Sequence, residues 1–294
     1  MPSPIVLARG IRAAGAASPR IAGALAYRAF FSTGARMPVH ERDTATHEAA
    51  KTGRLAVRGA ELTTYEWGTG SDSVLLLHGW RGRASQFAPL VRELVAEGLR
   101  VVAFDAPAHG SSGGRDTDVR DWIAAAGALQ AEHPPFTALV GHSFGALAAL
   151  TAARTTVPVP AVVTIAGAAS PAAFVEEFVR ELALRPGTAS AMRSLFLARL
   201  GVDDAGLDAQ YDAARHPLPD STRLLVVHDG ADRRMPDADS VRLHEAHGQR
   251  SRLLRTQGFG HTRILSADAV LDAVVAHVQE ARVRTPAERA ISPR

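Results

Sequence analysis

From about residue 53 onward, short apolar runs alternate with segments of helical periodicity, and this alternation constrains the fold more than any other feature of the chain. Such a pattern predicts a mostly parallel sheet with helices on both of its faces. We expect eight strands, within 54–57, 61–67, 73–79, 99–107, 137–142, 161–167, 223–230 and 252–258. We expect helices over 85–97, 118–132, 237–247 and 267–283, and one more that begins at Ser143.

One connection is far longer than this pattern requires. About 55 residues separate the strand that ends near Gly167 from the strand that starts near Arg223, whereas roughly 2 to 6 residues are usual. Three stretches within this connection show helical spacing, which predicts a helical cap inserted after the sixth strand. We therefore divide the chain into a basic N-terminal arm or helical extension (1–52), a core (53–168 and 221–294) and the helical cap (169–220).

The N-terminal arm concentrates positive charge. Of the 33 basic and 30 acidic residues, the first 40 positions hold five arginines and no acid, which leaves 28 basic and 30 acidic residues elsewhere. The core is therefore nearly neutral, and we expect no nucleic-acid partner. Two interpretations of the arm stay open: a basic amphipathic helix that contacts a membrane or acts as a transit peptide, or an arm that packs its aromatic residues against the core. We favour the second.

The composition excludes several kinds of site. The chain contains no cysteine, so disulfides, thiolate metal sites and cysteine nucleophiles are ruled out. We expect a cytoplasmic protein, with no metal and no organic cofactor. A hydrophobic content of 46% over 294 residues supports a folded core. No run of 18 apolar residues is present, so no membrane-spanning helix is expected.

The segment VGHSFGA (140–146) joins a predicted buried strand to a predicted helix. An abrupt turn from strand to helix forces the residue between them, Ser143, into strained backbone angles, and side chains at Gly141 and Gly145 would collide with their neighbours. The helix would direct its free N–H groups and positive dipole end toward Ser143. The spacing alone also fits an ordinary Gly/Ser turn, but the flanking strand and helix favour a nucleophile.

A serine nucleophile needs a histidine base and a carboxylate that orients it. Two candidate acids, Asp229 and Asp232, stand at the end of the strand 223–230 and just after it, and His261 follows Gly260 in a glycine-containing loop after the last strand. The chain order of serine, acid and histidine is the order that enzymes with the G-x-S-x-G motif use. Three independent signals therefore agree.

Five segments, taken in order, resemble recurrent blocks of the α/β-hydrolase fold superfamily, in its serine-hydrolase branch of esterase-like and lipase-like enzymes. They are LLLHGW (75–80), FDAPAHGSS (104–112), GHSFGA (141–146), HDGADRRMP (228–236) and GFGHTRIL (258–265). The resemblance covers about four fifths of the chain, and five ordered blocks are far more specific than one motif. It implies the α/β-hydrolase fold, an eight-stranded mostly parallel sheet.

The resemblance also implies a role for each site residue. Ser143 would be the nucleophile, His261 the general base and Asp232 the orienting acid, because the acid of the family stands just before a hydrophobic residue and a proline. The backbone N–H groups of Trp80 and Phe144 would form the oxyanion hole.

The implied function is hydrolysis of an acyl bond in a small or medium apolar substrate, through an acyl-enzyme. Phe174 and Phe178, four residues apart in the cap, would line the acyl pocket or merely hold the cap helices together. Two other functions stay open: an acyltransferase with the same three residues, and a ligand-binding or receptor protein on a hydrolase scaffold. The nature of the scissile bond and the oligomeric state stay open as well.

Overall fold

The structure is a computed structural model that describes residues 4–289, with the backbone alone for residues 4–5 and 284–289. The predicted arm and core extend at their outer ends to residues 1–3 and 290–294, which lie outside the described residues. Eight strands form one sheet in the order β1-β2-β4-β3-β5-β6-β7-β8. The strands are β1 (Lys51–Val57), β2 (Ala60–Trp67), β3 (Ser73–Leu77), β4 (Arg100–Asp105), β5 (Ala138–His142), β6 (Ala161–Ile165), β7 (Arg223–Asp229) and β8 (Ser251–Thr256).

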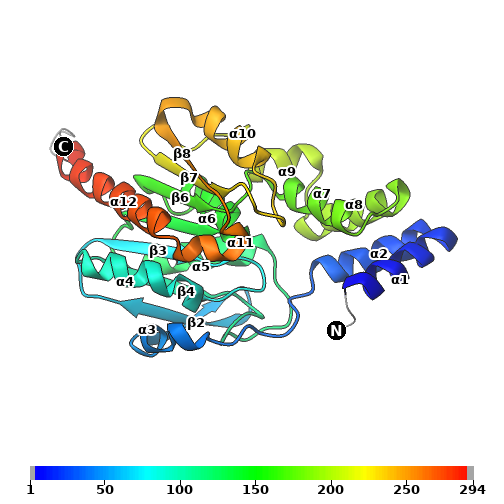
Figure 1. Cartoon of the computed structure of the whole chain (residues 1–294), viewed down its shortest axis with the longest axis horizontal. Coiled ribbons are helices and arrows are strands. Elements are labelled where there is room, and N and C mark those ends of the chain that lie inside the picture. Colours follow the sequence, from blue (N-terminus) through cyan, green and yellow to red (C-terminus); the bar gives the residue numbers. More distant parts are fainter. Residues whose placement is uncertain (1–3, 290–294) are drawn as a thin grey trace.

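Helices flank the sheet and extend beyond one end of it (Figure 1). The α-helices are α1 (Pro4–Ala17), α2 (Pro19–Phe30), α3 (Thr44–Glu48), α4 (Ala88–Ala96), α5 (Val119–Glu132), α6 (Phe144–Thr155), α7 (Pro171–Glu181), α8 (Pro186–Leu200), α9 (Asp204–Tyr211), α10 (Ala238–His247), α11 (Gly260–Arg263) and α12 (Asp268–Arg289). Short 3-10 turns cover Glu41–Asp43, Ala84–Phe87, Gly248–Arg250 and Ile264–Ser266. Among the described residues, no helix is long and apolar enough to cross a bilayer.

The sheet is mostly parallel, as the sequence predicts. β1 and β2 pair antiparallel with each other, β2 pairs antiparallel with β4, and every other neighbouring pair is parallel. Side chains of β3 alternate between two apolar layers: Leu75 and Leu77 join one with α5 and α6, whereas Val74 and Leu76 join the other with α4 and α12. Because both faces of the sheet are buried, the central strands are continuously apolar.

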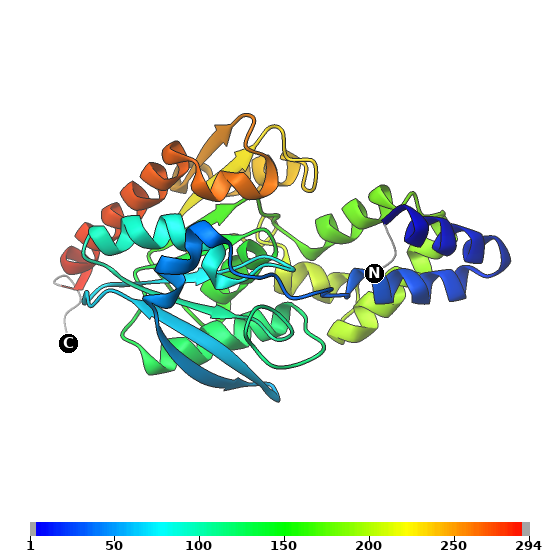
Figure 2. The same cartoon turned by 60° about the horizontal axis from the view of Figure 1, so that its bottom comes forward.

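Two helical units extend from the core at the end away from the C-terminus, and they lie side by side in Figures 1 and 2. One unit, which we call the N-terminal hairpin, consists of α1 and α2. The other, which we call the helical insertion, consists of α7, α8 and α9 and connects β6 to β7. Small residues on α2 allow it to approach α8 closely, since a Cβ at Gly23 would stand 2.5 Å from the Cβ of Ala191.

The aromatic residues of the arm therefore pack, but mainly against the helical insertion. Phe30 contacts the rings of Phe178 and Phe196, and Phe31 contacts Phe196 and Trp80. On the outer face of α2, Ile21 and Leu25 are exposed. The membrane contact considered for the arm stays a prediction.

The close approach of the two units gives a first test. Gly23→Ala is expected to lower the free energy of unfolding by about 1–3 kcal/mol, because the added methyl group overpacks the contact with α8. It should also speed tryptic cleavage within the hairpin. Urea unfolding and a digestion time course measure the two effects.

Gly10→Ala is the matched control. A Cβ at Gly10, in α1, would meet no atom within 4 Å, so this change should raise the free energy of unfolding by roughly 0.5–1 kcal/mol through helix propensity. Equal stability of the two variants would contradict the close packing of α2 on α8.

Candidate active site

Ser143 occupies the sharp turn between β5 and α6. Its backbone angles are φ 53° and ψ −120°, a conformation that a residue with a side chain adopts only when its surroundings impose it. A Cβ at Gly145 would collide with the carbonyl oxygens of Leu77 and His78, and one at Gly141 would collide with the start of α6. The two glycines thus allow strand and helix to pass close enough to produce the turn.

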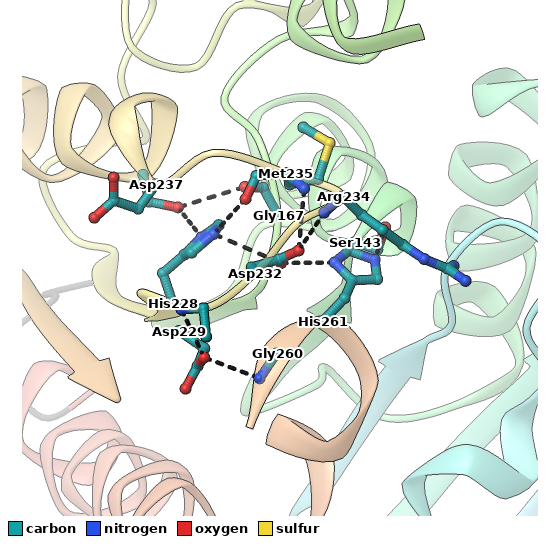
Figure 3. A network of polar contacts seen from close by, with 12 residues as sticks. Ser143, Gly167, His228, Asp229, Asp232, Arg234, Met235, Asp237, Gly260 and His261 are labelled. Atoms are coloured by element: carbon teal, nitrogen blue, oxygen red, sulfur yellow. Dashed lines mark hydrogen bonds and ion pairs between the residues drawn. The ribbon is translucent and has the colours of Figure 1, made fainter. Parts of the chain in front are cut away.

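A chain of hydrogen bonds links Ser143 to His261 and Asp232 (Figure 3). The Nε2 atom of His261 lies 3.0 Å from Oγ of Ser143, and its Nδ1 atom lies 2.7 Å from Oδ2 of Asp232. A carboxylate can only accept, so Nδ1 carries the proton and donates it to Asp232. In neutral His261, Nε2 is therefore the acceptor of the hydroxyl proton of Ser143.

Asp232 has no exposed side-chain surface, and its charge is compensated by donors. Its Oδ1 atom accepts the backbone N–H groups of Arg234 and Met235 at 2.8 and 3.1 Å. Burial raises the pKa of this carboxyl, but the hydrogen bond to His261, the charge of that ring and the two backbone donors outweigh burial and lower its pKa. Asp232 is therefore ionised at neutral pH.

Asp229, the other candidate acid, does not contact His261 and instead holds the loop that carries it. It ends β7, and its carboxylate accepts five hydrogen bonds, from the hydroxyl of Thr256 and the backbone N–H groups of Ala231, Gly258, Phe259 and Gly260. Burial raises its pKa, but these bonds prevail and lower the pKa of Asp229 to about 2. The sequence did not reveal this set of five hydrogen bonds, which we call the Asp229 clamp. The one available signal was an aspartate at the end of an apolar run, with glycines in the loops that follow it and precede His261.

His142 supports His261 from the other side. Its Nε2 atom donates to the carbonyl oxygen of His261 at 2.8 Å, and the two rings lie 5.0 Å apart between centroids. Burial, with the nearby charge of His261, lowers the pKa of His142 to about 3. The ring is therefore neutral at physiological pH and holds the backbone of His261 in place.

Trp80 and Phe144, the residues expected to form an oxyanion hole, are chain neighbours of two residues that meet at the turn, Gly79 and Ser143. Phe144 follows Ser143 as the first residue of α6, so its N–H has no acceptor within the helix. Trp80 follows Gly79, where a Cβ would stand 2.9 Å from the Cβ of Ser143. Both residues also line the cavity that opens at Ser143. That their N–H groups form an oxyanion hole stays a prediction.

A cavity of about 1080 Å³ extends from Ser143 and His261. Phe174 and Phe178, both on α7, line it; that they bind an acyl group stays a prediction. Phe30 and Phe31 line it too, although neither interpretation of the arm placed them at the site. Their two adjacent rings at the end of a helix were the one available signal. Within residues 4–289, no group of His, Asp and Glu side chains is arranged to hold a metal ion.

Known proteins resemble the chain in sequence pattern and in fold. The model of the "Alpha/beta hydrolase family" matches residues 74–289. Comparison with the sequences of curated proteins finds no match. Three solved structures share the fold at low identity: the Pyrococcus furiosus esterase Pf2001 (18% identity, 86% of this chain and 98% of that chain, TM-score 0.63), a bacterial membrane phospholipase A (18%, 82% and 90%, 0.60) and the thioesterase domain from the curacin biosynthetic pathway (19%, 78% and 99%, 0.55).

The clamp formed by Asp229 generates a second prediction. Asp229→Asn should destabilise the protein at pH 7, because the amide NH₂ group would face N–H donors. The folded-state pKa lies below the ordinary 3.8, so the carboxylate stabilises the fold above about pH 4 and loses this contribution as the pH falls toward 2. The difference in unfolding free energy between wild type and variant should therefore shrink over that range.

Asp220→Asn serves as the control, because the Asp220 side chain is 99% exposed and surface ion pairs contribute little. Urea unfolding of the three proteins at several pH values measures the effect. A difference for Asp229→Asn that stays constant between pH 5 and 3 would contradict the clamp.

Proposed function

The chain belongs to the alpha/beta hydrolase family, and on this premise we propose that it is a serine hydrolase that cleaves an ester or thioester of an apolar acyl group. The observation that carries the proposal is the hydrogen-bonded chain from Asp232 through His261 to Ser143, placed at one end of a large cavity. The buried carboxylate stabilises the imidazolium that forms during the reaction, and it also fixes the tautomer of His261.

In the proposed reaction, Oγ of Ser143 attacks the carbonyl carbon of the substrate while Nε2 of His261 accepts the hydroxyl proton. The backbone N–H groups of Trp80 and Phe144 stabilise the oxyanion of the tetrahedral intermediate, each such donor contributing about 10²- to 10³-fold in rate. His261 then gives its proton to the departing alcohol or thiol. The acyl group stays on Ser143.

The second half of the reaction uses the same groups. A water molecule attacks the acyl carbon and passes one proton to His261. As the second tetrahedral intermediate collapses, His261 gives that proton to Oγ of Ser143 and the carboxylic acid leaves. Since the reacting residue is a serine, the covalent intermediate is an ester, which water can cleave at the carbonyl. No metal or organic cofactor takes part in these steps.

The apolar character of the cavity supports an apolar acyl group. Besides Phe174 and Phe178, the lining includes Leu147 of α6, Leu182 and Leu200. The volume of about 1080 Å³ is slightly larger than the usual range for small-molecule sites, roughly 300–1,000 Å³. An acyl chain of medium or greater length fills such a space better than an acetyl group.

Substitution of the two acids next to β7 tests the proposal. With p-nitrophenyl esters, Asp232→Asn should lower kcat by about 10⁴-fold, because the amide would favour the wrong tautomer of His261. Ser143→Ala should lower kcat by about 10⁶-fold. Steady-state kinetics with active-site titration of the wild type measures both.

Asp229→Asn is the matched control, because it also replaces a carboxylate near His261 by an amide. Asp229, however, bonds to the backbone N–H of Gly260 and not to the imidazole. Its kcat should stay at least 100-fold above that of Asp232→Asn under conditions where both variants are folded. Hydrolysis that survives Ser143→Ala undiminished would contradict the proposal, and equal kcat values for the two acid variants would contradict the role of Asp232.

A further inference from the structure

The N-terminal hairpin forms part of the wall of the cavity. Leu7 of α1, Ala29 and Phe30 of α2, and then Phe31 and Met37 all line it. Every one of these residues precedes residue 74, where the match to the family model begins. The wall is therefore a feature of this chain outside the part that the family model covers.

Edge-to-face ring contacts join this wall to the helical insertion. The Phe30 ring lies 5.3 Å from that of Phe178 at an interplanar angle of 84°, and 5.9 Å from that of Phe196 at 88°. Such geometry is favourable beyond simple area burial. The hairpin thus lines the cavity together with α7 and α8, and Phe30 contacts both of these helices.

A second chain of rings leads back toward the serine. The ring centre of Phe31 lies 6.3 Å from that of Trp80, and the ring centre of Trp80 lies 5.2 Å from that of Phe144, the residue that follows Ser143. Successive aromatic rings therefore line the way from Ser143 to the hairpin. A flexible apolar chain attached at Ser143 would remain in contact with rings until it met Phe30.

Arg199 of α8 fixes the hairpin to the rest of the molecule. Its guanidinium donates to a carboxylate oxygen of Asp118 at 3.1 Å, where α5 begins, and to the hydroxyl of Tyr27 at 3.4 Å. Its central carbon also lies 4.4 Å from the centre of the Phe31 ring, a cation–π contact. One partly buried arginine thus joins hairpin, helical insertion and core, which makes the wall a built part of the site.

The side chains that line the cavity indicate which part of a substrate the hairpin could bind. The hairpin and the segment between it and β1 contribute only apolar residues to the cavity, including Leu7, Phe30 and Met37. Two acids that line the cavity are paired with arginines: Asp118 with Arg120 and Arg199, and Glu177 with Arg180. The hairpin itself offers no charged side chain to a substrate in the cavity.

We propose that the N-terminal hairpin is the distal part of the acyl site, and that the natural substrate carries a long apolar acyl chain whose far end packs against Phe30. This proposal rests on the proposed hydrolase function. Each CH₂ group buried there contributes about 0.8 kcal/mol, and binding energy from remote parts of a substrate is available to accelerate reaction at the carbonyl. The hairpin therefore sets the preference for acyl length.

Phe30→Ala tests the proposal. The value of kcat/KM for p-nitrophenyl dodecanoate, used as a monomer, should fall about tenfold, whereas that for p-nitrophenyl butyrate should change less than twofold. Phe30→Leu, which preserves an apolar side chain, should retain most of the activity on the dodecanoate. Leu25→Ala is the matched control, because Leu25 lies on the exposed face of the same helix and does not line the cavity. It should change neither ester.

If Phe30→Ala leaves the ratio of kcat/KM for the two esters unchanged, either because neither value falls or because both fall equally, the proposal is overturned. A separate measurement distinguishes its failure from failure of the hydrolase function. In the Ser143→Ala background, the Kd of dodecanoate measured by calorimetry should rise about tenfold with Phe30→Ala and stay unchanged with Leu25→Ala. If the wild-type protein hydrolyses no ester while this binding pattern is present, the proposed function is overturned and the acyl site is supported.

Discussion

The strained backbone of Ser143 is the constraint on which the rest of the site depends. The turn exists because Gly145 lets α6 pass against the end of β3 and Gly141 lets β5 meet the start of the same helix. The same contact brings Gly79, the residue before Trp80, against Ser143. One packing event, between a strand end and a helix start, thus sets the position of the hydroxyl.

Backbone hydrogen bonds, more than ion pairs, hold the acid and base in place. Asp229 accepts hydrogen bonds from the backbone N–H groups of the loop before His261. Asp232 accepts them from the backbone of its own loop and from the imidazole of His261. His142, kept neutral by burial, donates a hydrogen bond to the carbonyl oxygen of His261. Donors that belong to the backbone cannot move independently of the fold, so the histidine is positioned before any substrate arrives.

The sequence was sufficient for the sheet and for the meeting of three side chains. Buried strands are continuously apolar and stand out locally. Ser143 and Asp232 each follow such a strand, and His261 follows the edge strand β8, all at the same edge of the sheet. The choice of Asp232 over Asp229 came from a resemblance, since Asp229 ends β7, Asp232 follows three residues later, and only the loop hydrogen bonds distinguish them. The place of the hairpin was not predictable, because the small residues Gly23 and Ala191 meet across about 170 positions of sequence and carry no local signal.

Covalent labelling with a fluorophosphonate, read by peptide mass spectrometry, tests the central claim most directly. Such probes react with a serine whose proton is removed by a neighbouring base, and the account predicts one adduct per chain, on Ser143. The adduct should be lost in His261→Ala, which keeps the serine and removes the base. A folded wild-type protein that takes no label at Ser143, or one labelled equally well without His261, would contradict an activated nucleophile at the turn.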